Sequence, residues 1–122
     1  MERIEKFADD RGDFLVIDFS GIKSDEGFLD VIRSAKPLVA ASPLNSLYTA
    51  ANVENIRYDS KTKLIIMDFI EHNKPYVKCA AIFGMDGIKK LVIKTLMKLC
   101  GRKNVLFTFT KEKAIELLRQ QN

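Results

Sequence analysis

Residues 76–87 read YVKCAAIFGMDG, and they set the architecture expected of the chain. The run from Cys79 to Phe83 is unbroken in apolar character, which is typical of a strand buried on both faces in a parallel sheet. The glycine-rich turn 84–87 follows, and residues 88–100 then place apolar side chains at helical spacing. Gly101 is a residue suited to the end of a helix. The segment predicts a buried parallel strand followed by a helix.

The same order, a β-rich run and then a helical pattern, occurs four times along the chain. The strands are predicted at residues 14–19, 46–50, 76–83 and 104–109. The helices are predicted to begin at Ser24, at Asp59 or Ser60, at residue 88 and after Thr110, and the first is predicted to end or kink around Lys36, before Pro37. Residues 4–7 allow a hairpin with the first strand through the turn 9–12.

Strands that alternate with helices predict one α/β domain over residues 1–122. We expect a mostly parallel sheet of four or five strands and about four helices, with residues 1–12 as an N-terminal hairpin strand. Of the 122 residues, 47% are hydrophobic, which is enough for a core. The charged N-terminus and the two cysteines favour neither a signal peptide nor a disulfide framework, so a cytoplasmic protein without a membrane span is expected.

The carboxyl ends of the predicted strands indicate where a ligand would bind, because open α/β sheets bind ligands at that edge. We name this set of residues the rim. It is predicted to contain Ser20, Gly21, Asn52, Asp86 and Gly87, with Ala51, Gly84 and Thr110 nearby.

The segment 88–100 carries a basic stripe beside a wide apolar arc. Charge is uneven along the chain, because the first 61 residues hold eight Lys and Arg against eleven Asp and Glu, and the last 61 hold twelve against five. A basic face of this kind suits an acidic protein or an anionic lipid, although a solvated helix face would give the same pattern. The stripe is Lys90, Lys94, Lys98 and Arg102.

The apolar arc of this helix is wider than core packing requires. Ile88, Leu91, Val92, Leu96 and Leu99 are the expected core face, and Ile93, Met97 and Cys100 extend it. The cover for the extension is the chain's own loop, a second copy of the chain or an acyl chain. The predicted interaction surface is therefore Lys90, Ile93, Lys94, Met97, Lys98 and Arg102.

Residues that carry chemistry are sparse. His72 is the single histidine, and no Gly-x-Ser-x-Gly motif accompanies it. Cys79 and Cys100 fit small core residues, and they form no Cys-x-x-Cys motif. Aromatic side chains are not interleaved with basic ones, as single-stranded nucleic acid would require. We expect no catalytic residue, metal or cofactor, and no nucleic-acid partner.

Four segments resemble a small bacterial STAS-type domain, of the superfamily of anti-sigma-factor antagonists and CRAL-TRIO lipid carriers. They are VIDFSG (16–21), NKPYVK (73–78), AIFG (81–84) with GIKK (87–90), and FTFTKEKAIELL (107–118). The resemblance covers about residues 13–119. It implies a non-enzymatic regulatory module that binds a partner protein or itself as a homodimer. The alternative is a small lipid- or hydrophobic-ligand-binding protein, with an anionic amphiphile as ligand.

The resemblance also draws attention to Ser24. Anti-sigma-factor antagonists carry an Asp-Ser-Ser-Gly-like phospho-acceptor turn at a helix start, and the comparable turn here is Ser24-Asp25-Glu26-Gly27. A phosphate is well received at a helix N-terminus, but the neighbouring carboxylates would repel it, and an N-cap role alone explains the serine. Ser24 is a candidate phospho-acceptor on this basis.

Overall fold

The computed structural model describes residues 2–101 and 104–121, without the side chains of residues 88 and 89. Its five strands are β1 (Ile4–Asp9), β2 (Gly12–Asp18), β3 (Leu47–Asn52), β4 (Val77–Phe83) and β5 (Val105–Thr108). The four helices within the described ranges are α1 (Asp25–Ala40), α2 (Ser60–Asn73), α3 (Gly87–Leu99) and α4 (Lys111–Arg119). The element order and type match the prediction.

The strands form one sheet in the order β1-β2-β3-β4-β5. β1 and β2 form the antiparallel hairpin that residues 4–12 allowed, and the other neighbouring strands are parallel. The prediction of a mostly parallel sheet of four or five strands is confirmed.

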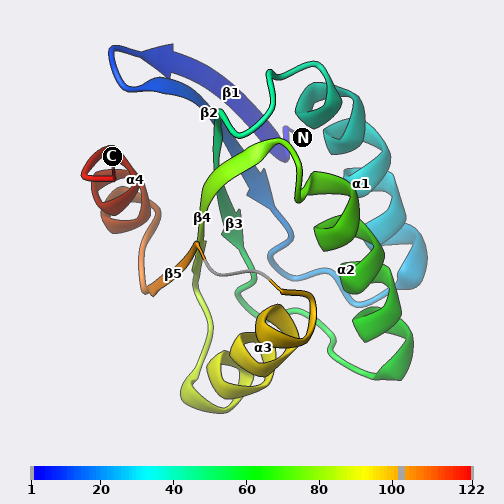
Figure 1. The fold of residues 1–122 in the computed structure, drawn as a ribbon. Helices are drawn as coiled ribbons and strands as arrows, with labels where there is room; N and C mark the ends of the chain where they lie inside the picture. The colour runs from blue at the N-terminus through cyan, green and yellow to red at the C-terminus, as the bar shows by residue number, and fades with distance from the viewer. Residues whose placement is uncertain (1, 102–103, 122) are drawn as a thin grey trace.

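The helices are divided unequally between the two faces of the sheet (Figure 1). Crossovers between parallel strands are right-handed almost without exception, and here each crossover advances the sheet in the same direction. α1, α2 and α3 are therefore placed on one face. α4 follows β5, and it covers the opposite face.

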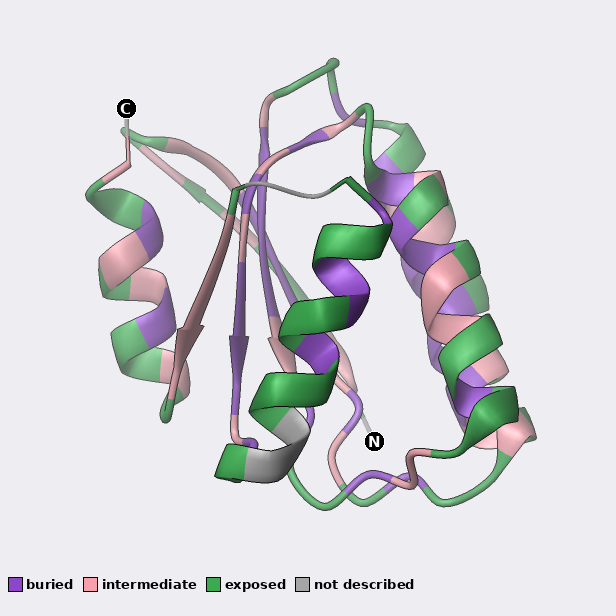
Figure 2. Cartoon of the chain, turned by 60° about the horizontal axis from the view of Figure 1, so that its bottom comes forward, coloured by how far each residue is buried: buried purple, intermediate pink, exposed green. Residues whose placement is uncertain are grey.

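Each strand contributes to two cores, because successive side chains point to opposite faces. In β2, Leu15 and Ile17 belong to the core beneath α1–α3. Phe14 and Val16 belong to the smaller core beneath α4, which Leu118 also enters. Figure 2 shows the buried residues concentrated in the sheet and on the inner sides of the helices. Burial on both faces accounts for the continuous apolar run of β4.

The predicted helix starts are present as N-caps. The hydroxyl of Ser24, the carboxylate of Asp59 and the hydroxyl of Thr110 each accept a hydrogen bond from the backbone N–H three residues later. These bonds satisfy N–H groups that have no partner inside the helix. The end of α3 is also as predicted, because Gly101 follows it with φ of 72°.

Of the two outcomes predicted around Lys36, an end or a kink of α1, the end is wrong. The helix continues to Ala40, with Pro37 inside its last turn. Proline removes one hydrogen bond from a helix, but Val39 beyond it is fully buried against the sheet. Burial of this last turn offsets the lost bond, and the Pro37 carbonyl still accepts a hydrogen bond from the Ala41 N–H at 3.0 Å.

Candidate functional site

The structure brings part of the predicted rim together. The Phe19 N–H donates to the Asn52 carbonyl at 2.9 Å, so the chain after β2 runs beside the end of β3. The Ser20 N–H donates to Asp18 Oδ1 at 2.9 Å, and Asn52 Oδ1 accepts from the Glu54 N–H at 3.0 Å. These polar groups of the rim are thus used to hold its own turns. Asp86 directly precedes α3, and Gly87 is its first residue.

A hollow of about 520 Å³ lies beside Asn52, over the sheet face that α4 covers. Arg3, Glu5, Asp18 and Lys111 are its charged neighbours. The Arg3 guanidinium donates to the carbonyls of Asp18 and Ser20 at 3.1 and 3.0 Å. Lys111 pairs with Glu5 at 2.8 Å. Because these cations are already paired within the chain, the hollow presents no concentrated charge of one sign.

An arginine that the sequence did not single out joins the first turns of α1 and α2. The Arg57 guanidinium pairs with Asp25 and with Asp59, the latter at 3.0 Å, and donates to the Thr62 hydroxyl at 3.2 Å. The Thr62 N–H donates to the Asp59 carboxylate and lowers the pKa of that group, and the charge of Arg57 acts in the same direction. The cluster fixes the two helix starts relative to each other.

Ser24, the candidate phospho-acceptor, is exposed, and its hydroxyl caps α1 by accepting from the Gly27 N–H at 3.0 Å. Ser24→Ala is expected to lower the free energy of unfolding by about 1 kcal/mol, the usual cost of losing an N-cap. Urea denaturation monitored by circular dichroism measures this loss. Ser34→Ala, an exposed serine within the same helix, is the control and is expected to cost less than about 0.5 kcal/mol. Equal losses in both variants would contradict the capping role.

The side of α3 that enters the core differs from the prediction. Ile93, Leu96, Met97 and Cys100 are buried and belong to the main core. The extended part of the apolar arc is therefore covered by the chain itself, and Ile93 and Met97 do not form an exposed interaction strip. The reason is that the arc is wide enough for two orientations of the helix, and the sheet takes the Ile93–Met97 side.

The other part of the apolar arc faces outward instead. Leu91 and Leu99, both predicted as core, are each 69% exposed, and Val92 is 39% exposed. With Thr95, which lies between them, they make up what we call the outer face of α3. A groove of about 440 Å³ separates this face from α2, with Tyr58 and Lys63 on its far side. Burial raises the pKa of the Tyr58 phenol, which stays protonated as a hydrogen-bond donor.

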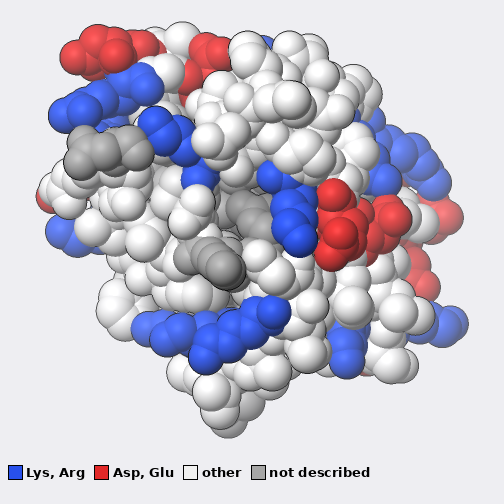
Figure 3. Space-filling view, viewed as in Figure 1, with Lys and Arg blue, Asp and Glu red and all other residues white. Residues whose placement is uncertain are grey.

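A row of lysines runs along α3 beside the outer face (Figure 3). The described members of the predicted stripe, Lys90, Lys94 and Lys98, are exposed. Arg102, the fourth predicted member, lies outside the described residues. Because successive residues of a helix are 100° apart, the row lies next to Leu91 and away from the groove. It is on the side of α3 toward β5, where Lys94 Nζ is 6.0 Å from the centre of the Phe107 ring. We call these three residues the lysine row.

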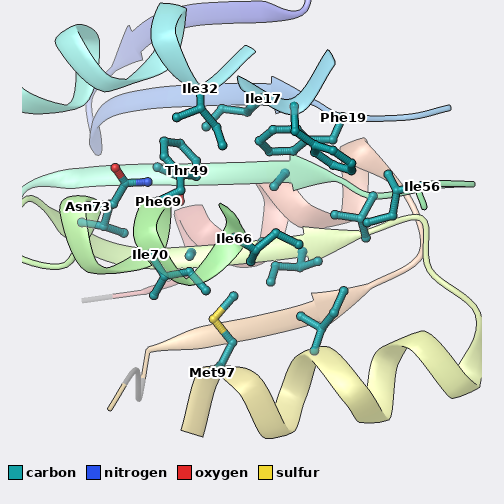
Figure 4. Close-up of a pocket in the computed structure, with 18 residues that line it drawn as sticks. Ile17, Phe19, Ile32, Thr49, Ile56, Ile66, Phe69, Ile70, Asn73 and Met97 are labelled. Atoms are coloured by element: carbon teal, nitrogen blue, oxygen red, sulfur yellow. The ribbon is translucent and has the colours of Figure 1, made fainter. Parts of the chain in front are cut away.

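A pocket of about 90 Å³ lies between the sheet and the three helices α1–α3 (Figure 4). We call it the core cavity. Its walls are almost wholly apolar, with Phe69 and Ile70 from α2 and Ile93 and Met97 from α3. An apolar void of this volume lowers stability by roughly 2 kcal/mol, at about 24 cal/mol per Å³. No pattern in the sequence indicates the cavity, since it depends on how the side chains pack.

The size of the core cavity limits what it can hold. An apolar cavity of about 150 Å³ holds one benzene ring. A space of about 90 Å³ is therefore too small for an acyl chain. The core cavity therefore does not support the alternative of a lipid carrier.

Other chemistry in the described residues is limited. His72 Nδ1 lies 2.9 Å from Asn73 Oδ1. Cys79 and Cys100 are buried, and neither forms a disulfide within the described residues. No group of three or more His, Cys, Asp or Glu in the described ranges could hold a metal ion. None of the described helices combines the length and the hydrophobicity that crossing a bilayer requires.

Comparison with known proteins places the fold. No family model matches the chain, and neither does any curated protein. Among solved structures, the chain is similar to an uncharacterized protein of the DUF3478 family with a SpoIIAA-like fold from Shewanella loihica PV-4, with a TM-score of 0.74 over 94% of this chain and 91% of that one.

The chain has a SpoIIAA-like fold.

The resemblance to a STAS-type domain is thereby confirmed at the level of the fold. The two chains are 11% identical. At that identity, the SpoIIAA-like fold carries no site residue or partner from one chain to the other, so function has to be argued from this chain's own surface.

Proposed function

We propose that this SpoIIAA-like chain is a non-enzymatic, cytoplasmic interaction module with a regulatory role. It binds an acidic, amphipathic helix of a partner protein on the outer face of α3. The observation that carries the proposal is the exposure of Leu91 and Leu99, about two turns apart on the side of α3 that borders the lysine row. An apolar strip bordered by cations is the complement of such a helix.

The apolar part of this surface has a groove for a partner to occupy. Burying one leucine side chain contributes about 1.5–3 kcal/mol, and the isolated chain leaves both Leu91 and Leu99 largely in water. Val92 extends the surface into the groove beside α2. A partner helix that lies along α3 would bury Leu91 and Leu99, and side chains from one side of that helix would enter this groove.

The positive charges around the groove favour a negatively charged partner. Lys63 lines the groove, and the lysine row borders the opposite side of the outer face. Within the described part of the chain, none of these four lysines forms an ion pair. Acidic side chains on the partner would supply the missing counter-charges, so binding should weaken as salt is raised.

The proposal is tested with a synthetic helical peptide that has leucines on one face and glutamates on the other. Leu91→Ser/Leu99→Ser is expected to weaken its binding at least about tenfold, since about 1.4 kcal/mol corresponds to a factor of ten. Fluorescence anisotropy of the labelled peptide measures the dissociation constant. The matched control is Leu44→Ser, because Leu44 is 71% exposed but lies between α1 and β3, and its binding should be unchanged.

Three further measurements separate this proposal from other occupants of the same surface. A peptide with lysines in place of glutamates should not bind. Vesicles of phosphatidylglycerol should not retain the protein, and sedimentation should show a monomer. Binding to the vesicles that is lost in the double variant, or a dimer that the double variant disrupts, would overturn the proposal. So would equal peptide binding by the wild type and the double variant.

A further inference from the structure

We propose that the core cavity is a binding site for one small, neutral molecule with an apolar body and a carbonyl oxygen. This site is separate from the outer face of α3 and does not depend on the proposed interaction. Two polar side chains line a space that is otherwise apolar, and they are the basis of the inference.

The first polar group is Thr49, in the middle of β3. Thr49 is 7% exposed, and its side chain lies on the face of the sheet that α1–α3 cover. Its hydroxyl makes no hydrogen bond with any of the described residues, although buried hydroxyls are nearly always paired. The Thr49 hydroxyl is therefore a donor and acceptor that faces the cavity without a partner.

The second polar group is Asn73, the last residue of α2, which is 6% exposed. Its side-chain oxygen lies 2.9 Å from His72 Nδ1, and its amide nitrogen has no hydrogen-bond partner within the described chain. Figure 4 shows this nitrogen pointing toward Thr49. A carboxamide and a hydroxyl on one wall form a small polar pole in an apolar cavity.

The polar pole defines the chemistry of the occupant. An N–H of Asn73 and the O–H of Thr49 are both donors, and a carbonyl oxygen has two lone pairs to accept them. No charged side chain is among the described residues that line the cavity, so an ionised molecule would lose its hydration without compensation. The apolar walls match a hydrocarbon body. A neutral carbonyl compound satisfies all three conditions.

The volume of the cavity sets the size of the occupant. Because a cavity of about 150 Å³ holds a benzene ring, a cavity of 90 Å³ suits roughly four non-hydrogen atoms. Acetone has this size and carries the required oxygen. Xenon is an apolar probe for the same space and forms no hydrogen bond.

The experiment is a titration of the full chain with acetone and with xenon, followed by methyl NMR. Met97 is the reporter, since its side chain lines the cavity from α3. Both probes are expected to shift the Met97 methyl resonance, and to compete. Thr49→Val should weaken acetone binding about tenfold, through the lost hydrogen bond, and leave xenon binding unchanged. Thr49→Ser, which keeps the hydroxyl, should retain acetone binding.

A filled cavity provides the matched control. Ala51→Val and Ala80→Val each add methyl groups at positions that line the space, and either variant should abolish the response to both probes while the remaining spectrum stays that of a folded protein. The proposal is overturned if neither probe shifts Met97 in the wild type, or if acetone binds equally to the wild type and Thr49→Val. A long-lived water beside Met97 that acetone does not displace would also overturn it.

Discussion

Met97→Glu is expected to unfold the protein, whereas Leu99→Glu leaves it folded. The two residues are neighbours on α3, but Met97 is 9% exposed within the main core and Leu99 is 69% exposed. A carboxylate at position 97 would lose its hydration without a charged partner, at a cost of several kcal/mol. Whole domains of this size are stable by about 5–15 kcal/mol, so that cost removes most or all of the stability. At position 99 the change should be within about 0.5 kcal/mol.

Far-UV circular dichroism and urea denaturation of both variants measure this contrast. A folded Met97→Glu protein together with an unfolded Leu99→Glu protein would mean that α3 packs on its other side. The surface proposed for the partner would then be part of the core. The pair thus tests the orientation of α3 without any binding partner.

Leu118→Ala is expected to lower the free energy of unfolding by about 3 kcal/mol, the usual cost of truncating a fully buried leucine. Leu118 is completely buried in the smaller core. In the described chain, α4 is the helix that covers this face of the sheet, so neighbouring elements cannot easily fill the space.

Urea denaturation of Leu118→Ala provides the measurement, with Glu116→Ala as the control on the exposed side of the same helix. The control is expected to change stability by less than about 0.5 kcal/mol. A loss below about 1 kcal/mol in Leu118→Ala would indicate that α4 is only loosely attached to the sheet.

The features that could be predicted from the sequence are local ones. The caps at Ser24, Asp59 and Thr110 follow from hydrogen bonds that span three residues, and the period-2 and helical patterns locate the elements. The sheet type followed from the apolar run of β4, because only burial on both faces accommodates it.

The orientation of α3 could not be predicted for a physical reason. Apolar residues surround more than half of the helix, so the pattern allows either the Ile93 side or the Leu91 side to face the sheet. The choice depends on the shape of the sheet and of α2, which no local pattern contains. The exposed leucines of α3 are consequently on a different side of the helix from the predicted apolar strip.

The Arg57 cluster and the core cavity also depend on distant parts of the chain. Arg57 and Asp25 are 32 residues apart, and nothing near either residue indicates its partner. Thr49 lies in a segment predicted as a weak strand, where its hydroxyl has no special meaning until α2 brings Asn73 to the same space. Such sites require the packed structure.

The sequential order of the sheet has a consequence for how the chain folds. Each strand pairs with the strand that precedes it in the sequence, so no strand has to wait for a partner several elements away, and such topologies fold faster than those that require more distant pairings. During synthesis, each new unit can add to an edge that already exists. The last helix is the exception, because the apolar face with Phe14 and Tyr48 stays uncovered until α4 leaves the ribosome. The nascent chain is most prone to aggregation in that interval.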